Sequence, residues 1–273
     1  MPLLALLAAV TLTSLAPDAA ATLPTFSRAD EARIVGELCG AVQPGSATTD
    51  GLTGKAETVA GYLNPAGLFI YEVILSVSYR EGPAVRHLLV LGGHAIEDGE
   101  IRGVQAQNTE IDAGLAEWRG GKWVLAAKAP ELTTVGQYGH NPAVVLHEIG
   151  ASRHAFEVSE GYFNQGAVLE HLSLYEPTTA GIQEVLSLNL VADDCVDERK
   201  NCFKYEGKLE YPPKSAAATY DLKLTLSGTY RSSKGAVVRV PAAPLVLRLQ
   251  DDGYAPVGAS RADLWRAVTS SPW

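Results

Sequence analysis

The side chains best suited to recognise another molecule lie in a short segment, residues 160–166 (EGYFNQG). Glycines there bracket two aromatic rings and two amides between strand-like stretches. Aromatic rings stack on a sugar or a peptide and amides hydrogen-bond to it, so this composition indicates a recognition loop. Residues 136–141 (GQYGHN) have a similar composition, and two such loops at the same end of a sheet would form one surface. The predicted binding residues are Tyr138, His140, Tyr162, Phe163, Asn164 and Gln165. The alternative is a hairpin turn whose rings fold back on the sheet.

A pair of histidines beside a glutamate invites comparison with zinc proteases. Those enzymes place two histidines four residues apart on one helix, and the glutamate between them acts as the base. His147 and His154 are seven residues apart, which on a helix is about 10.5 Å of rise and too far for one metal ion. On a strand, His147 and Glu148 point to opposite faces. The sequence therefore predicts no metal ligands and no cofactor, and a looser site that adds His140 stays open as the alternative.

Ser152 is the serine with the most suggestive neighbours. Residues 150–154 (GASRH) share part of the Gly-x-Ser-x-Gly pattern of hydrolases but lack its last glycine. That pattern requires a strand, a tight turn and a following helix, whereas a strand-like stretch follows here. We therefore predict an exposed turn serine, with a serine-based hydrolase as the alternative. The chain has no Walker loop and no dinucleotide-binding pattern.

Two of the three cysteines lie close together in a polar stretch, residues 193–202. We predict a disulfide between Cys195 and Cys202, because the start of the chain indicates export to an oxidising compartment. The carboxylates of this stretch lack the spacing of a calcium loop, so they read as a solvated loop. Cys39 is predicted to pack on a helix, and an intermolecular disulfide is the alternative.

The start of the chain predicts export. Residues 3–15 are almost wholly apolar, and a run of alanines follows at residues 19–21. An apolar core of this length before small residues is typical of a cleaved signal peptide, here residues 1–21. The run is shorter than the roughly 20 residues of a membrane span. The expected location is periplasmic or secreted, with no membrane insertion after cleavage.

Composition narrows the class of partner. Hydrophobic residues make up 47% of the chain, which is enough for a packed core. The formal charge is −9 at pH 7. An acidic protein repels phosphate backbones and anionic lipids, so neither nucleic acid nor a membrane surface is expected as a partner.

Periodicity predicts a mainly β protein. A helix begins at Ser27 and ends before Gly40, and residues 43–58 read as a linker or long loop. Residue alternation then predicts strands, including residues 68–79 and a strand over 85–91 that ends at a glycine pair. Gly120 and Gly121 predict a tight hairpin turn that places Trp118 beside Trp123. Further predicted elements are strands around 154–158, 172–175, 203–211 and 220–226, two edge pieces within 237–249, and a helical turn over 262–268.

The expected fold is an antiparallel sandwich, barrel or meander with one N-terminal helix. Residues 22–58 form an N-terminal helix and loop, and residues 59–273 form a β-rich domain that could divide into two subdomains. We expect an exported, non-catalytic binding protein of a bacterial-type envelope that recognises a protein or glycan, as inhibitors and immunity proteins do. The alternatives are a secreted hydrolase, using the histidines or Ser152, and a structural envelope protein that self-associates through Cys39.

Overall fold

The computed structural model describes residues 22–50, 57–102, 108–135, 141–164, 167–195, 202–213, 215–258 and 261–270. The predicted signal peptide, residues 1–21, lies outside the described residues. So do three of the predicted binding residues, which are Tyr138, His140 and Gln165.

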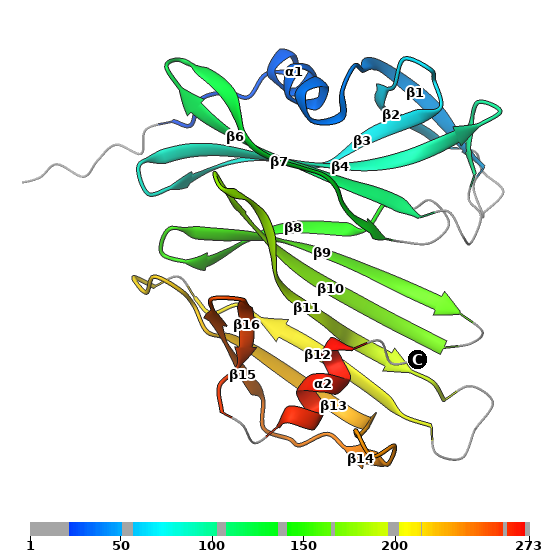
Figure 1. Cartoon of the computed structure of the whole chain (residues 1–273), viewed down its shortest axis with the longest axis vertical. Helices are drawn as coiled ribbons and strands as arrows, with labels where there is room; N and C mark the ends of the chain where they lie inside the picture. Colours follow the sequence, from blue (N-terminus) through cyan, green and yellow to red (C-terminus); the bar gives the residue numbers. More distant parts are fainter. Residues whose placement is uncertain are drawn as a thin grey trace, which may run out of the picture.

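Within these residues the chain is mainly β, as predicted, with one helix near each end (Figure 1). Helix α1 is Arg28–Cys39 and helix α2 is Ala262–Thr269. The first sheet comprises β1 (Gln43–Asp50), β2 (Glu57–Leu63), β3 (Phe69–Glu81), β4 (Ala84–Glu97), β5 (Glu100–Arg102), β6 (Thr109–Arg119) and β7 (Lys122–Val135). Strands β1 to β5 close into a five-stranded barrel, because β3 pairs with β4 and β5 pairs in parallel with β1. Strands β6 and β7 extend the sheet from β4.

The second sheet is antiparallel and runs in the order β16-β15-β13-β12-β11-β10-β9-β8, with β14 on β13. Its strands are β8 (Ala143–Gly150), β9 (Arg153–Asn164), β10 (Ala167–Thr178), β11 (Gly181–Asp193), β12 (Lys204–Glu210), β13 (Leu222–Arg231), β14 (Val237–Arg239), β15 (Leu245–Gln250) and β16 (Gly253–Pro256). The predicted break of residues 237–249 into two short strands is confirmed. Almost every strand therefore pairs with the one before it in sequence, which is a meander.

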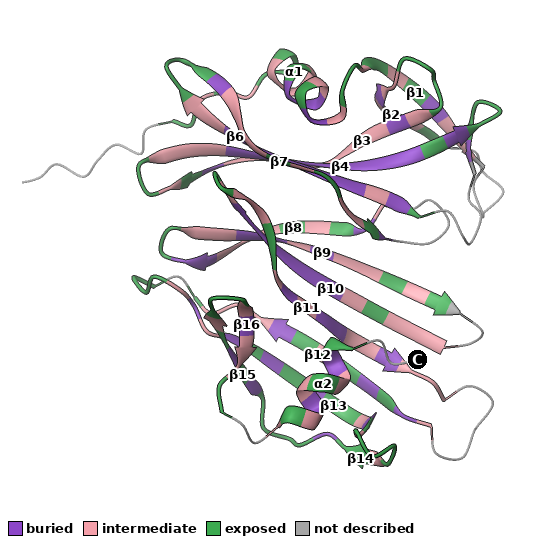
Figure 2. Cartoon of the chain, viewed as in Figure 1, coloured by how far each residue is buried: buried purple, intermediate pink, exposed green. Residues whose placement is uncertain are grey.

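Buried residues, coloured purple in Figure 2, occur on the strands of both sheets and on both helices. Their side chains form the clusters that hold the layers together. Helix α1 covers the outer face of the first sheet through Ile34, Val35 and Leu38. The two sheets pack through a second cluster that includes Ile111 of β6 and Phe156 of β9. Helix α2 packs on the second sheet in a third cluster, so each helix covers one sheet and the sheets cover each other.

Helix α1 begins and ends where the sequence predicts. The Ser27 side chain accepts a hydrogen bond from the Asp30 backbone, and the Asp30 carboxylate accepts one from the Ser27 backbone. This reciprocal cap satisfies two of the amide groups that a helix start leaves unpaired. Gly40 follows the last turn with a positive φ of 85°, which side chains with a Cβ rarely adopt.

The predicted tryptophan hairpin is confirmed. Gly120 and Gly121 have φ of 56° and 81°, as a two-residue turn with both positions left-handed requires. Trp118 lies opposite Trp123 in the register of β6 and β7, with ring centroids 5.4 Å apart in an edge-to-face arrangement.

The predicted loop over residues 43–58 is wrong, because strand β1 and the start of β2 lie there. Glycines, which weaken a strand prediction, serve here to let a neighbouring backbone or side chain approach. A Cβ on Gly61 would lie 2.2 Å from the Tyr71 carbonyl oxygen, and one on Gly45 would lie 2.3 Å from the Leu63 side chain. Such close packing suits a barrel of only five strands.

The predicted strand end at the Gly92 and Gly93 pair is also wrong, since β4 continues to Glu97. A Cβ on Gly92 would lie 2.1 Å from Asn141 Oδ1, and one on Gly93 would lie 2.5 Å from the Phe69 ring. These glycines therefore make room for neighbouring side chains within a continuous strand.

Among the described residues, no helix has the length and apolarity needed to cross a membrane.

Candidate functional site

A cavity of about 530 Å³ lies over the middle of the second sheet. Strands β9, β10 and β11 form its floor, the end of β7 forms one wall, and the last residues of α2 form another. This volume lies within the range of small-ligand pockets. Residues from four strands and a helix meet here, so the cavity depends on the packing of both sheets.

A chain of hydrogen bonds crosses the cavity floor. Asn189 Nδ2 donates to the Ser270 carbonyl oxygen at 2.7 Å, and Asn189 Oδ1 lies 3.0 Å from His171 Nδ1. An amide nitrogen cannot accept, so the Ser270 contact assigns Oδ1 to the histidine side. His171 Nδ1 must then carry the proton and donate to Asn189. The neutral imidazole therefore presents the lone pair of Nε2.

Two serines face that lone pair. Ser187 Oγ lies 3.2 Å from His171 Nε2, and Ser173 Oγ lies 3.3 Å from the same atom. The serines are opposite each other in the register of β10 and β11. Ser173 is buried, whereas Ser187 keeps partial exposure to the cavity.

Tyr175 completes this polar floor. Its phenol hydrogen-bonds with Ser173 and with Thr133 of β7. Burial raises the pKa of Tyr175 above its ordinary value, since the charged phenolate is poorly solvated there. The phenol is therefore protonated at neutral pH and keeps its ability to donate.

Carboxylates line the rim of the cavity. The Tyr162 hydroxyl donates to Glu160 Oε1 at 2.6 Å, and both residues line the cavity along with Glu184. Burial, followed by the bond to Glu160, raises the pKa of Tyr162. An aromatic ring with a fixed hydroxyl thus stands beside acceptor oxygens, which is a surface that hydroxyl-bearing molecules can bind.

Two of the predicted binding residues, Tyr162 and Phe163, separate in the structure. Tyr162 lines the cavity, but alternation along β9 directs Phe163 to the other face of the sheet, where its side chain is 55% exposed. Asn164 is the last residue of β9. The predicted partnership of this segment with Tyr138 and His140 falls outside the described residues.

The two described histidines of the metal-site alternative, His147 and His154, do not meet, and His140 lies outside the described residues. His154 is opposite Glu148 in the register, so it shares a face with Glu148 and not with His147. His147 stacks on Tyr211 at 3.8 Å between centroids, and its Nε2 lies 3.1 Å from Glu157. His154 instead packs on the Tyr79 ring of β3, with centroids 4.4 Å apart.

Glu157 serves as the common partner of this stack, since Tyr211 also donates to it at 2.8 Å. Burial alone would raise the pKa of Glu157, but the neighbouring His147 ring and the hydrogen bond from Tyr211 hold it below its usual value. Ser152 lies exposed in the turn between β8 and β9, as predicted.

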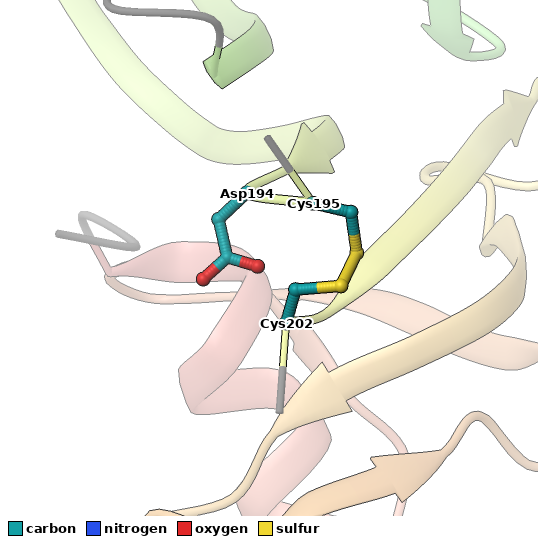
Figure 3. A group of neighbouring side chains, drawn as sticks. All are labelled: Asp194, Cys195 and Cys202. Atoms are coloured by element: carbon teal, nitrogen blue, oxygen red, sulfur yellow. A yellow bond between two sulfur atoms is a disulfide. The ribbon is translucent and has the colours of Figure 1, made fainter. Parts of the chain in front are cut away.

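The predicted disulfide between Cys195 and Cys202 is present (Figure 3). Asp194 lies close to both sulfur atoms, and these three residues form one group with metal-ligand atoms near one another in the described chain. The sulfurs are joined to each other, so they offer no thiolate to a metal ion. Arg231 also forms an ion pair with Asp194 at 3.2 Å. The ion pair and the disulfide therefore give this group a structural role.

Sequence reasoning missed His171, Ser187 and Asn189. His171 lies on β10, and the other two lie on β11. Ser187 is 16 residues and Asn189 is 18 residues from His171 along the chain, a spacing that matches no local motif. The sequence feature that could have indicated them is the presence of polar residues on an otherwise buried stretch of β10 and β11.

Comparisons with protein-family models, with curated proteins and with solved structures gave no match.

Proposed function

We propose that this is an exported binding protein whose cavity takes a hydroxyl-bearing ligand such as the end of a glycan. The observation that carries the proposal is the composition of the cavity wall. It combines the Tyr162 ring with the carboxylates of Glu160 and Glu184 and with the amide and hydroxyls of the floor. Sugars are bound by aromatic stacking together with paired donors and acceptors, and this wall offers both.

Charge on the cavity lining supports a neutral or cationic ligand over an anionic one. Glu160 and Glu184 line the cavity, and both act electrostatically on Tyr175 of its floor. No Lys or Arg stands among the described residues that line the cavity. An anionic ligand would meet the negative charge of these carboxylates, whereas a sugar hydroxyl would donate to the same oxygens.

Export is the second part of the proposal. An apolar stretch followed by alanines at residues 19–21 supports a cleaved signal peptide. The Cys195–Cys202 disulfide supports an oxidising compartment. The protein would thus work in the periplasm or outside the cell.

Two neighbouring variants test the binding site. Tyr162→Ala removes the ring that lines the cavity, and Phe163→Ala removes a ring of similar size from the other face of the same strand. Calorimetric titration with a panel of neutral mono- and disaccharides should detect binding to the native protein and to Phe163→Ala, but not to Tyr162→Ala. Binding that depends on Phe163 alone would contradict the proposal and point to a protein partner on the outer face of the β9–β10 hairpin.

A further inference from the structure

The order of side chains on the cavity floor is that of an acyl-transfer site. Ser187 contacts one nitrogen of His171, and Asn189 contacts the other. A hydroxyl within reach of a base that is itself oriented by a third group is the arrangement of serine and cysteine hydrolases. We propose that Ser187 is a nucleophile, His171 its general base and Asn189 the residue that positions the base, and that the cavity hydrolyses a carboxylic ester.

The direction of the hydrogen bonds supports this order. Asn189 cannot turn its amide around without losing its bond to the Ser270 carbonyl oxygen. Its oxygen therefore holds His171 with the proton on Nδ1, and Nε2 is left to accept a proton from a serine. This is the tautomer that a general base requires.

Ser187, and not Ser173, is the serine that reaches a substrate. Ser173 is 6% exposed and also hydrogen-bonds the Tyr175 phenol. Ser187 is partly exposed and lines the cavity. Its proton can go to His171 while its oxygen faces the space where a ligand would lie.

Charge that develops on a carbonyl oxygen needs donors. The hydroxyls of Tyr175 and Thr133 belong to the same cavity and hydrogen-bond each other. The phenol stays protonated at neutral pH, because burial disfavours its charged form. Of these two hydroxyls, we assign the Tyr175 phenol as the donor to the oxyanion, because Thr133 already donates to the phenol oxygen.

The reaction balances with water as the only co-reactant. Ser187 Oγ bonds to the ester carbon while its proton moves to His171 Nε2. The bond between that carbon and the alcohol oxygen then breaks, and the alcohol leaves with the proton from Nε2. Water next gives its proton to Nε2 and its hydroxyl to the acyl carbon. The bond between that carbon and Ser187 Oγ then breaks, and Nε2 returns the proton to Oγ, which releases the acid and restores Ser187.

The class of substrate rests on the proposed function. If the cavity binds hydroxyl-bearing ligands, the ester to be cleaved is an acyl group on such a ligand, for example an O-acylated sugar. The nucleophile itself does not depend on that ligand, so the two proposals can fail separately.

A fluorophosphonate probe tests the nucleophile directly, because it forms a bond to an activated serine oxygen and releases fluoride. Intact-mass analysis of the native protein should show one adduct, and peptide mapping should place it on Ser187. Ser187→Ala and His171→Gln should reduce the labelling rate about 100-fold or more, the scale of a lost general base. Ser152→Ala, which changes the exposed turn serine, should label at the native rate.

Peptide mapping of the native protein needs no variant to fold, so the test stands even if Ser187→Ala is unstable. An adduct on another serine, or no adduct, would overturn the inference. If the unlabelled protein still binds sugars through Tyr162, the proposed function survives and only the catalytic inference fails.

The role of Asn189 has its own readout. An acceptor on Nδ1 stabilises the protonated imidazole, so Asn189→Ala should move the pH profile of the labelling rate to lower pH. A general loss of rate with an unchanged profile would show that Asn189 only supports the fold.

Discussion

Asn189 of β11 donates to the carbonyl oxygen of Ser270, the residue that follows α2, at 2.7 Å. This bond ties the end of the C-terminal helix to the floor of the cavity. The same amide orients His171, so the position of α2 and the state of the imidazole are linked. Events that loosen α2 are therefore expected to reach the cavity.

Leu264→Ala should test that link. Leu264 is 2% exposed and packs with Val268 in the cluster beneath α2. Truncating a buried leucine costs about 2–5 kcal/mol, and part of that loss should appear as local release of α2. Urea unfolding should show the loss, and hydrogen exchange should show faster exchange at residues 262–270. The exposed Arg266→Ala is the control, with an expected change within about 0.5 kcal/mol.

Two glycine-to-alanine changes should act in opposite directions. Gly92→Ala places a Cβ 2.1 Å from Asn141 Oδ1 within β4, so it should destabilise the protein by about 1–3 kcal/mol. Gly36→Ala lies in α1 with nothing within 4 Å of the new atom. It should stabilise the protein by about 0.5–1 kcal/mol through helix propensity. Thermal unfolding measures both, and an unharmed Gly92→Ala would contradict the account of the continuous strand.

His87 should make the protein acid-sensitive. Its ring is buried, stacks on Phe26 at 3.5 Å and lies between Ser76 and Ser78. Burial lowers the pKa of His87 to about 4 from 6.5. Between pH 6.5 and 4 the unfolded chain binds a proton that the folded chain does not, so stability present above pH 6.5 falls as the pH falls.

A pKa of about 4 in place of 6.5, at 1.36 kcal/mol for each pKa unit, lowers the free energy of unfolding by about 3 kcal/mol over this pH range. Urea unfolding at pH 7 and at pH 4.5 should show a smaller loss on acidification in His87→Gln than in the native protein. Equal losses would mean that acid acts through other groups, such as the carboxylates.

The disulfide should contribute measurable stability. The loop closed by Cys195 and Cys202 is short, and the chain-entropy estimate for its length is about 2.5 kcal/mol. The double variant Cys195→Ser/Cys202→Ser should lose about this amount in chemical unfolding. Thiol titration of the unfolded, unreduced native protein should find Cys39 alone, since it is the free cysteine of the structure. Three reactive thiols would contradict both the disulfide and the oxidising compartment.

Local rules predicted much of the fold. Ser27 and Gly40 mark the ends of α1, and the glycine pair at 120 and 121 marks the hairpin between β6 and β7, because caps and tight turns depend on neighbouring residues. The barrel strands β1 and β2 escaped prediction, since their glycines are explained only by what packs on them. In the sequence, Gly92, which makes room for the Asn141 side chain within β4, cannot be told apart from a glycine that ends a strand.

The cavity could be predicted only in part. Tyr162, which lines the cavity, was selected from the composition of residues 160–166. Its separation from Phe163 follows from β9 continuing through both residues. His171 and Asn189 meet because β10 pairs with β11 in one register, with a bulge beside His171. That register is a property of the whole sheet, and no short motif records it.

Nuclear magnetic resonance of the protein labelled with ¹³C at its histidine rings tests the cavity most directly. His171 lies on the floor, while His147 stacks on Tyr211 outside the residues that line the cavity, so one spectrum holds both probe and control. His171→Gln would assign the probe signal. Titration with the sugars found by calorimetry should shift the His171 signal and leave that of His147 in place. A shift at His147 without one at His171 would contradict the cavity as the binding site.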